Sequence, residues 1–167
     1  IIAKKYANSI AEGITVHGEI VNQAPTGQWI QKLYDYGHEQ KTLDLYVYRI
    51  FFTNVKGKVF ELSTPQVQKY CLENGLKPVP IFYYGKAADL YPELKPDEHW
   101  HQEFLNKLMA QYTEKDCYMC KNSVPEEGIV VTKNETGFES YKLKSFRFLE
   151  RETKELDSGE VNTEDLG

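Results

Sequence analysis

The stretch that decides the fold runs from Leu43 to Asn54 and reads LDLYVYRIFFTN. It is the longest β-prone segment of the chain and is rich in the β-branched and aromatic residues that strands favour. Residues 56–62, KGKVFEL, follow after the polar connection Asn54–Gly57, which predicts an antiparallel hairpin. The alternating, β-branched stretch ITVHGEI predicts a further strand over Ile14–Ile20. Antiparallel strands are therefore expected at the centre of the fold.

Helices are expected to pack outside these strands. Ser63-Thr64-Pro65 predicts a helix start, with Thr64 as the cap and Pro65 at the first helical position, and Asn74-Gly75 predicts its end. A second helix is predicted over residues 98–112, capped by Asp97, and an amphipathic helix is predicted from about Ser145.

The remaining β-prone segments are shorter. Extended pieces are predicted at residues 29–37 (WIQKLYDYG) and 79–85 (VPIFYYG). Two strands are predicted at residues 128–133 and 138–144, joined by the turn NETG at 134–137. Runs of antiparallel strands with helices packed outside them define the α+β class.

Composition narrows the class of protein. At 167 residues the chain is long enough for one domain with a substantial core. No apolar run approaches the roughly 20 residues that span a membrane, so no membrane partner is expected. Three cysteines, an odd number, argue against a secreted disulfide framework and predict a reducing, cytoplasmic location. The net charge of −5 argues against nonspecific nucleic-acid binding by bulk charge.

Two strands place a glutamate beside a glycine. Gly18-Glu19 lies inside a predicted strand, where a glycine marks a bulge or the close approach of a ligand. Glu127-Gly128 repeats the pair at the start of a later strand. A solvated glutamate beside a bulge explains either pair alone, whereas two carboxylates near nucleotide oxygens suit Mg²⁺, which prefers hard oxygen ligands.

Lys142 and Lys144 follow one strand later and project from one face of it, because their spacing is two residues. Neighbouring cations repel each other, and an anionic ligand removes that repulsion. Phosphate is the natural candidate, since lysine binds it as a point charge. Tyr48 lies in the middle of its strand, where an aromatic side chain either belongs to the core or stacks on a base.

The order of these features resembles a known family. The segments that carry the resemblance are VHGEIV, WIQKLYDYG, LYVYRIFFTN, PEEGIVV and FESYKLKSFRFLE, in this order. Over about Ile14–Glu150 the chain resembles the nucleotidyltransferase domain of ATP-dependent polynucleotide ligases, most closely the phage-type RNA ligases. The resemblance implies a ligase-type nucleotidyltransferase fold, with ATP-grasp-like antiparallel sheets flanked by helices. It divides the chain into an N-terminally truncated adenylation domain, residues 1–150, and an acidic tail or linker, residues 151–167.

The same resemblance implies roles for five residues. Glu19 corresponds to a glutamate that contacts the ribose or the metal-bound nucleotide, and Tyr48 to an aromatic residue that stacks on adenine. Glu127 corresponds to a residue that helps to hold a divalent metal, and Lys142 and Lys144 to residues that contact the nucleotide phosphate. The implied cofactors are ATP, or AMP, and Mg²⁺. The implied partners are nucleic-acid ends, above all RNA ends in RNA repair, and the chain is expected to act as a monomer.

The implied reaction has three steps, in which a lysine takes AMP from ATP, AMP passes to a 5′-phosphate, and a 3′-hydroxyl then attacks that adenylated end. The chain departs from the family in three places. No lysine here satisfies the nucleophile motif Lys-x-(Asp/Asn/His)-Gly upstream of Glu19, so this fragment alone is expected not to ligate. Arg49 replaces a frequent acidic residue, and Thr132 replaces a frequent arginine.

Other interpretations stay open. A capping-type guanylyltransferase shares the motif order, and a catalytically inactive nucleotide- or nucleic-acid-binding module would also lack the lysine. Cys117-Tyr-Met-Cys120 has the spacing of a zinc knuckle, with Cys71, His99 and His101 as further ligands, or it holds two reduced thiols. The basic residues Lys142, Lys144, Arg147 and Arg151 form either a nucleic-acid track or the solvated face of the last helix.

Overall fold

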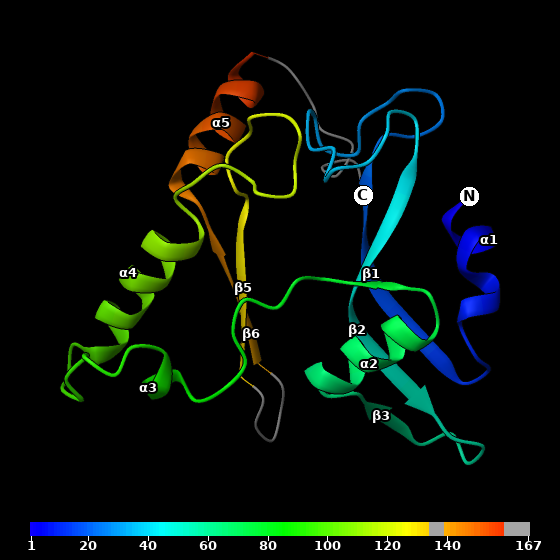
Figure 1. The fold of residues 1–167 in the computed structure, drawn as a ribbon, viewed down its shortest axis with the longest axis horizontal. Helices are drawn as coiled ribbons and strands as arrows, with labels where there is room; N and C mark the ends of the chain where they lie inside the picture. Colours follow the sequence, from blue (N-terminus) through cyan, green and yellow to red (C-terminus); the bar gives the residue numbers. More distant parts are fainter. Residues whose placement is uncertain (134–138, 159–167) are drawn as a thin grey trace. The chain divides into compact units, whose positions relative to one another are not determined.

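The computed structural model describes residues 1–133 and 139–158 and shows the expected α+β class (Figure 1). The chain divides into two compact units. The N-terminal unit comprises Ile1–Pro80, and the C-terminal unit begins at Ile81 and includes the other described residues. Among the described residues, no helix combines the length and the apolar character that crossing a membrane requires.

The N-terminal unit is built on a four-stranded sheet. Its strands are β1 (Ile14–Asn22), β2 (Leu43–Thr53), β3 (Val59–Glu61) and the two-residue β4 (Lys77–Pro78). The order β1-β2-β3 is antiparallel, and β4 runs parallel beside β2. The predicted strand over 14–20 and the predicted hairpin of 43–54 with 56–62 are therefore confirmed.

A bulge in the β1–β2 pairing sets the faces of this sheet. His17 pairs with Arg49 and Gly18 pairs with Val47, so Tyr48 is an extra residue on β2. A regular strand would turn Val47 and Ile50 to opposite faces, because their spacing is odd. The extra residue changes the phase, and both side chains are fully buried in the core.

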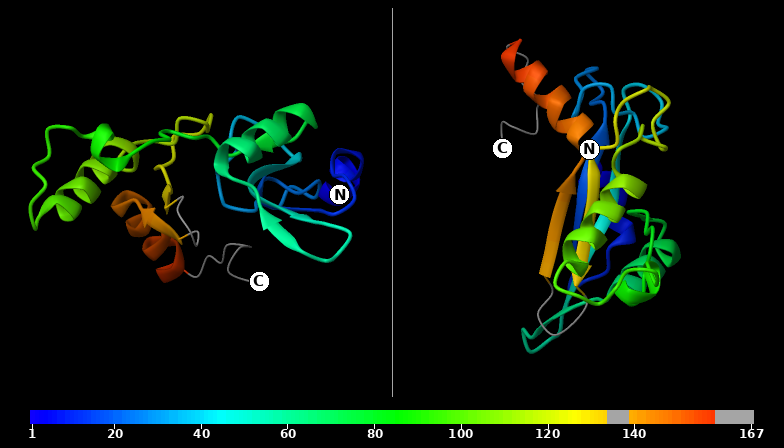
Figure 2. Two further views of the ribbon diagram at one scale, coloured as in Figure 1. Left: turned by 90° about the horizontal axis from the view of Figure 1, so that it is seen from below. Right: turned by 90° about the vertical axis from the view of Figure 1, so that its left-hand side faces the viewer.

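Three short helical segments accompany the sheet: α1 (Ile2–Tyr6), the 3₁₀ turn η1 (Ala7–Ser9) and α2 (Thr64–Glu73). Helix α2 lies beside the sheet (Figures 1 and 2) and contributes Val67 and Cys71 to the core. The helix cap is Ser63 and not the predicted Thr64, because Ser63 is the last residue with an extended backbone. Its N–H donates to Gln66 Oε1 at 2.8 Å, as in a capping box.

Residues 29–37 do not form the predicted extended piece. Their only β pairing is a single bridge between Gln23 and Trp29. Leu33, Tyr36 and Gly37 have φ angles of 69°, 46° and 77°. These left-handed conformations are incompatible with a strand and turn the chain into a compact loop.

Residues 79–85, predicted as a strand or an extended segment, contain no strand. The strand in this region is β4, two residues earlier, and the backbone from 79 to 85 is irregular. Val79 N still donates to Val47 O at 2.9 Å, beyond the last residue of β4.

The C-terminal unit contains α3 (Ala87–Leu90), α4 (Trp100–Tyr112), the antiparallel hairpin of β5 (Gly128–Lys133) and β6 (Glu139–Lys144), and α5 (Phe146–Asp157). Both hairpin strands were predicted, whereas the predicted turn at 134–137 lies outside the described residues. Helix α4 begins two residues later than predicted, with His99 at its cap position and Asp97 Oδ1 accepting from His99 N at 2.9 Å.

Helix α5 continues directly from β6 (Figure 2) and begins where predicted. Ser145 caps it, and the Ser145 Oγ accepts from Phe148 N at 3.2 Å. Because α5 extends to Asp157, the sequence boundary at residue 150 falls inside a helix.

A buried carboxylate ties α1 and β4 to the sheet. Asp44 on β2 is 3% exposed and accepts from Lys5 Nζ at 3.0 Å, from Lys77 Nζ at 2.6 Å and from the Tyr6 hydroxyl. Burial alone would raise the pKa of Asp44, but the hydrogen bonds from Lys77, Tyr6 and Lys5 outweigh it and hold that pKa far below its usual range. The three donors come from residues 5, 6 and 77, so one side chain joins distant parts of this unit.

We expect Asp44→Asn to destabilise the N-terminal unit by about 2 kcal/mol or more at neutral pH, because two lysines lose their buried partner. In a Trp100→Phe background Trp29 is the only tryptophan, so urea unfolding followed by its fluorescence measures this unit. A depressed folded pKa stabilises above the unfolded value of about 4 and loses its effect as pH falls below it. The gap between parent and variant should therefore shrink below about pH 4.

Glu73→Gln is the matched control, since the side chain of Glu73 is 62% exposed and its pair with Lys69 is long, at 3.8 Å. It should change the free energy of unfolding by less than about 0.5 kcal/mol. Equal effects of the two substitutions at neutral pH would show that Asp44 does not organise the unit.

Candidate functional site

The N-terminal unit carries two of the five predicted site residues on neighbouring strands. Glu19 on β1 pairs with Tyr46 on β2, and Tyr48 lies two residues further along β2. Tyr48 is 50% exposed, so it does not belong to the core, and Glu19 is exposed as well. The bulge thus presents an aromatic ring to solvent close in register to a carboxylate.

Gly18 is required by the approach of the two strands. A Cβ added at this position would lie 2.5 Å from the carbonyl oxygen of Tyr46 and 2.8 Å from Leu45 Cδ1. Real Cβ atoms do not approach a backbone oxygen so closely, so a larger residue would push β1 away from β2. The predicted bulge is confirmed, and strand packing accounts for the glycine.

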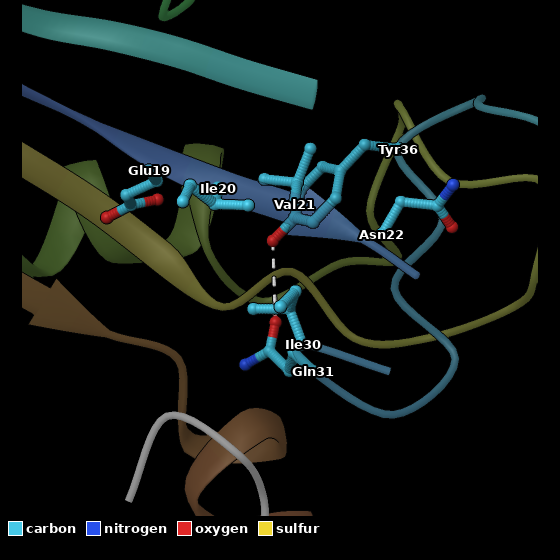
Figure 3. Close-up of a pocket in the computed structure, with 7 residues that line it drawn as sticks. All are labelled: Glu19, Ile20, Val21, Asn22, Ile30, Gln31 and Tyr36. Atoms are coloured by element: carbon cyan, nitrogen blue, oxygen red, sulfur yellow. Dashed lines mark hydrogen bonds between the residues drawn. The ribbon is translucent and has the colours of Figure 1, made fainter. Parts of the chain in front are cut away.

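A small pocket adjoins Glu19 at the end of β1 (Figure 3). It is shallow and partly open to solvent, and is lined by Glu19, Ile20, Val21, Asn22, Ile30, Gln31 and Tyr36. The Tyr36 hydroxyl donates to Gln31 Oε1 at 3.4 Å across it. The loop after β1, for which the sequence predicts an extended piece, therefore supplies polar groups beside Glu19.

Asn22 holds this loop in place. Its φ angle is 74°, and its Nδ2 donates to the carbonyl oxygens of Glu39 and Thr42, both at 2.7 Å. Its own carbonyl accepts from Ile30 N at 2.9 Å. These bonds anchor both ends of the loop at the last residue of β1.

The C-terminal unit carries the other three predicted residues. Glu127 immediately precedes β5, and Lys142 and Lys144 lie on β6 opposite Val130 and Gly128. Lys142 Nζ forms an ion pair with Glu127 Oε1. Lys144 Nζ lies 3.3 Å from Glu152 Oε1 on α5, and 5.1 Å from the centroid of the Phe148 ring.

These ion pairs change the argument made from the sequence. The spacing of the two lysines predicts an anionic ligand that offsets their repulsion. Glu127 and Glu152 already offset it, so the lysine spacing alone does not demand a phosphate. A phosphate would instead have to replace a carboxylate at one or both lysines.

The other two basic residues of the predicted cluster are paired as well. Arg147 lies 2.6 Å from Asp116, and Arg151 lies 2.7 Å from Glu155 one turn along α5. All four basic side chains therefore contact carboxylates, which favours a solvated, charge-balanced face over a nucleic-acid track.

Two residues that depart from the family pattern are also engaged within the protein. Arg49 Nε lies 2.8 Å from Glu61 Oε1, across to β3. The Thr132 hydroxyl lies 3.1 Å from that of Ser140 across the hairpin.

Glu126 is a further candidate site residue that the sequence patterns do not indicate. Burial is the main cause that raises the pKa of its carboxyl, and the charge of Glu127 raises it further, while Lys115 opposes both. Among the described residues, its buried Oε2 has no hydrogen-bond partner. Only its position beside Glu127 could have pointed to it, because its burial depends on tertiary packing.

Gly128 fixes where Glu127 lies. Its φ angle is 152°, and an added Cβ would overlap the carbonyl oxygen of Leu143 on β6. The carbonyl of Glu127 accepts from Ser145 N at 2.9 Å, which joins the start of β5 to the start of α5. The backbone on both sides of the Glu127 side chain is thus set by strand pairing.

A family model described as RNA ligase matches residues 2–146. The chain belongs to the RNA ligase family. No curated protein matches it significantly. The match confirms the resemblance stated from the motifs and includes all five predicted site residues. Within this RNA ligase family chain, Glu19 and Tyr48 lie together in one unit, and Glu127, Lys142 and Lys144 lie together in the other.

The described part of this family member lacks the larger ligand sets with which proteins hold metal ions. It contains no group of three or more His, Cys, Asp or Glu side chains arranged to hold a metal ion. The predicted zinc alternative therefore has no complete ligand set among the described residues. Mg²⁺ needs fewer protein ligands, because it keeps several waters and takes oxygens from substrate phosphates.

We expect Gly128→Ala to destabilise the C-terminal unit by about 2 kcal/mol or more, because the new Cβ meets backbone on β6. In a Trp29→Phe background Trp100 reports on this unit during urea unfolding. Thr132→Ala, which removes one exposed hydrogen bond of the same hairpin, should cost less than about 1 kcal/mol. A Gly128→Ala protein as stable as the Thr132→Ala control would contradict the packing argument.

Proposed function

We propose that this chain is the adenylyltransferase core of an RNA ligase, which binds ATP or AMP with Mg²⁺. The observation that carries the proposal is the family match over residues 2–146, since it spans both motif-bearing units. The exposed aromatic residue of one unit and the paired glutamate and lysine of the other agree with that activity.

Tyr48 and Glu19 are proposed to recognise the nucleoside. A half-exposed tyrosine offers a free face on which adenine stacks, and base–aromatic stacking contributes about 1–3 kcal/mol. The carboxylate of Glu19 is an acceptor suited to ribose hydroxyls. Glu19 also lines the neighbouring pocket, together with the polar side chains of Asn22, Gln31 and Tyr36.

Lys142 and Lys144 are proposed to bind the nucleotide phosphate, and Glu127 to hold Mg²⁺. The donor set fits the ion, because the Glu127 carboxylate is a hard oxygen ligand and its side chain is 19% exposed. When bound, Mg²⁺ would neutralise phosphate charge and polarise the phosphorus. Lys142 would exchange Glu127 for phosphate, which leaves the Glu127 carboxylate available as a ligand.

The proposed reaction joins a 5′-phosphate to a 3′-hydroxyl in three steps. A lysine amine attacks the α-phosphorus of ATP and releases pyrophosphate, AMP passes to the 5′-phosphate, and the 3′-hydroxyl displaces AMP. The residues of this chain position the nucleotide and stabilise its charge. The nucleophile motif does not occur upstream of Glu19 in these 167 residues, so nucleotide binding is the activity to test on this chain.

Competition separates this proposal from its alternatives. If GTP displaces a labelled AMP analogue more strongly than ATP does, the capping-type guanylyltransferase is the better assignment. If no nucleotide binds, the chain is a nucleic-acid-binding module or has another role.

We expect Tyr48→Leu to weaken Mg²⁺-dependent AMP binding about 10-fold in isothermal titration, because the stacking face is lost. Tyr48→Phe is the matched control and should bind AMP as the parent does, since it keeps the ring. The bulge places this side chain in solvent, so neither substitution should unfold the protein. Equal AMP affinities of the Tyr48→Leu and Tyr48→Phe variants would show that the Tyr48 ring does not contact the nucleotide.

We expect Glu127→Ala and Lys144→Ala each to weaken AMP binding about 10-fold, since each removes a charged contact. The Glu127→Ala effect should vanish without Mg²⁺, whereas the Lys144→Ala effect should remain. Glu139→Ala and Lys133→Ala change the same residue types at the other end of the hairpin and should leave affinity unchanged. Parent-like binding by both site variants, with unchanged unfolding temperatures, would show that the phosphate end lies elsewhere.

A further inference from the structure

Two cysteines face each other in the segment between α4 and β5 of the C-terminal unit. Cys117 is buried and Cys120 is half-buried, and neither is in a disulfide. The base of this segment is held by backbone pairing: Cys117 N donates to Val124 O at 2.8 Å, and Asp116 forms a β-bridge with Pro125. The two sulfurs are thus presented by a fixed loop.

The sulfur of Cys117 sits in a ring of donors. It accepts hydrogen bonds from the backbone N–H groups of Met119 and Cys120 and is hydrogen-bonded to the Cys120 thiol. The Cys120 thiol is the main cause that lowers the pKa of Cys117, while burial and the charge of Glu126 raise it. Donors of this kind stabilise a thiolate, which is the reactive form of cysteine.

Cys71, in the core of the N-terminal unit, provides the contrast. It is fully buried, and burial raises the pKa of its thiol to about 11. A thiol in this state is inert. The chain therefore holds one unreactive cysteine, Cys71, and one preorganised pair, Cys117 and Cys120.

We propose that Cys117 and Cys120 form a reversible intramolecular disulfide by exchange with a small-molecule disulfide. The two thiols are hydrogen-bonded to each other and lie three residues apart in a loop whose ends are joined by backbone pairing, so closing the bond requires little rearrangement. This proposal is independent of nucleotide binding, because neither cysteine is among the residues proposed to bind the nucleotide or Mg²⁺.

The exchange proceeds in two balanced steps. The more exposed Cys120 thiolate attacks one sulfur of the small disulfide, the old S–S bond breaks, and the departing thiolate takes up the proton that Cys120 lost. The Cys117 thiolate then attacks the Cys120 sulfur and expels the second small thiolate, which takes up the proton of Cys117. The protein loses two hydrogens, and one small disulfide becomes two thiols.

A metal is the competing occupant of such a pair. Among the described residues no third His, Cys, Asp or Glu side chain joins the two sulfurs in an arrangement suited to a metal ion. A closed tetrahedral zinc site takes four protein ligands, and the two thiols supply only two of them.

The test is intact mass after equilibration of the whole chain with oxidised and reduced glutathione at graded ratios. We expect the parent to lose two hydrogens as the oxidised fraction rises and to regain them on reduction. Alkylation after denaturation should then find one thiol in place of three, and peptide mapping should identify it as Cys71.

Single variants test the two-step order. Cys117→Ser should accumulate one glutathionyl group on Cys120, because the resolving thiolate is gone, whereas Cys120→Ser should react much more slowly at the buried Cys117. Three alkylatable thiols at every ratio, or a lasting glutathionyl adduct on the parent, would overturn the proposal. One zinc ion per chain in native mass spectrometry, lost in Cys117→Ser, would overturn it in favour of a metal site.

Discussion

The N-terminal unit depends on the bulged pairing of β1 with β2. Gly18 lets the strands approach where Tyr48 adds one residue to β2, and this insertion turns both Val47 and Ile50 into the core against α2. The same insertion leaves Tyr48 half exposed. Core formation and presentation of the aromatic ring are therefore two results of one backbone irregularity, and a change that removes the bulge would disturb both.

Charge pairing organises the candidate phosphate end in the C-terminal unit. Lys142 and Lys144 each contact a carboxylate, and both pairs are partly exposed. Pairs of this kind contribute only about 0–1 kcal/mol, so a nucleotide phosphate can replace the carboxylates at small cost. The carboxylates hold the ammonium groups in place without a ligand, which reduces the side-chain entropy that binding would otherwise lose.

Much of the fold could be predicted from local patterns. The alternation in β1, the apolar length of β2 and the start of α5 near Ser145 are encoded within a few residues of where they act, and each prediction was confirmed. The predicted extended piece at 29–37 does not form, because Leu33 and Tyr36 adopt left-handed conformations that their residue types rarely take. The Asp44 network was not foreseen, because it joins residues far apart in the sequence, which no local pattern records.

For the site, the sequence predicted which residues stand at the motif positions but not why each glycine accompanies its glutamate. Gly18 and Gly128 were both compatible with a bound ligand, yet at each one an added Cβ would meet the backbone of the partner strand. The glycines are thus dictated by strand pairing, and the same pairing sets the backbone of the glutamates beside them. A carboxylate on a backbone fixed in this way can exchange one side-chain partner for another while its Cα stays in place. That property suits a nucleotide site, and the glutamate–glycine pairs of both units share it.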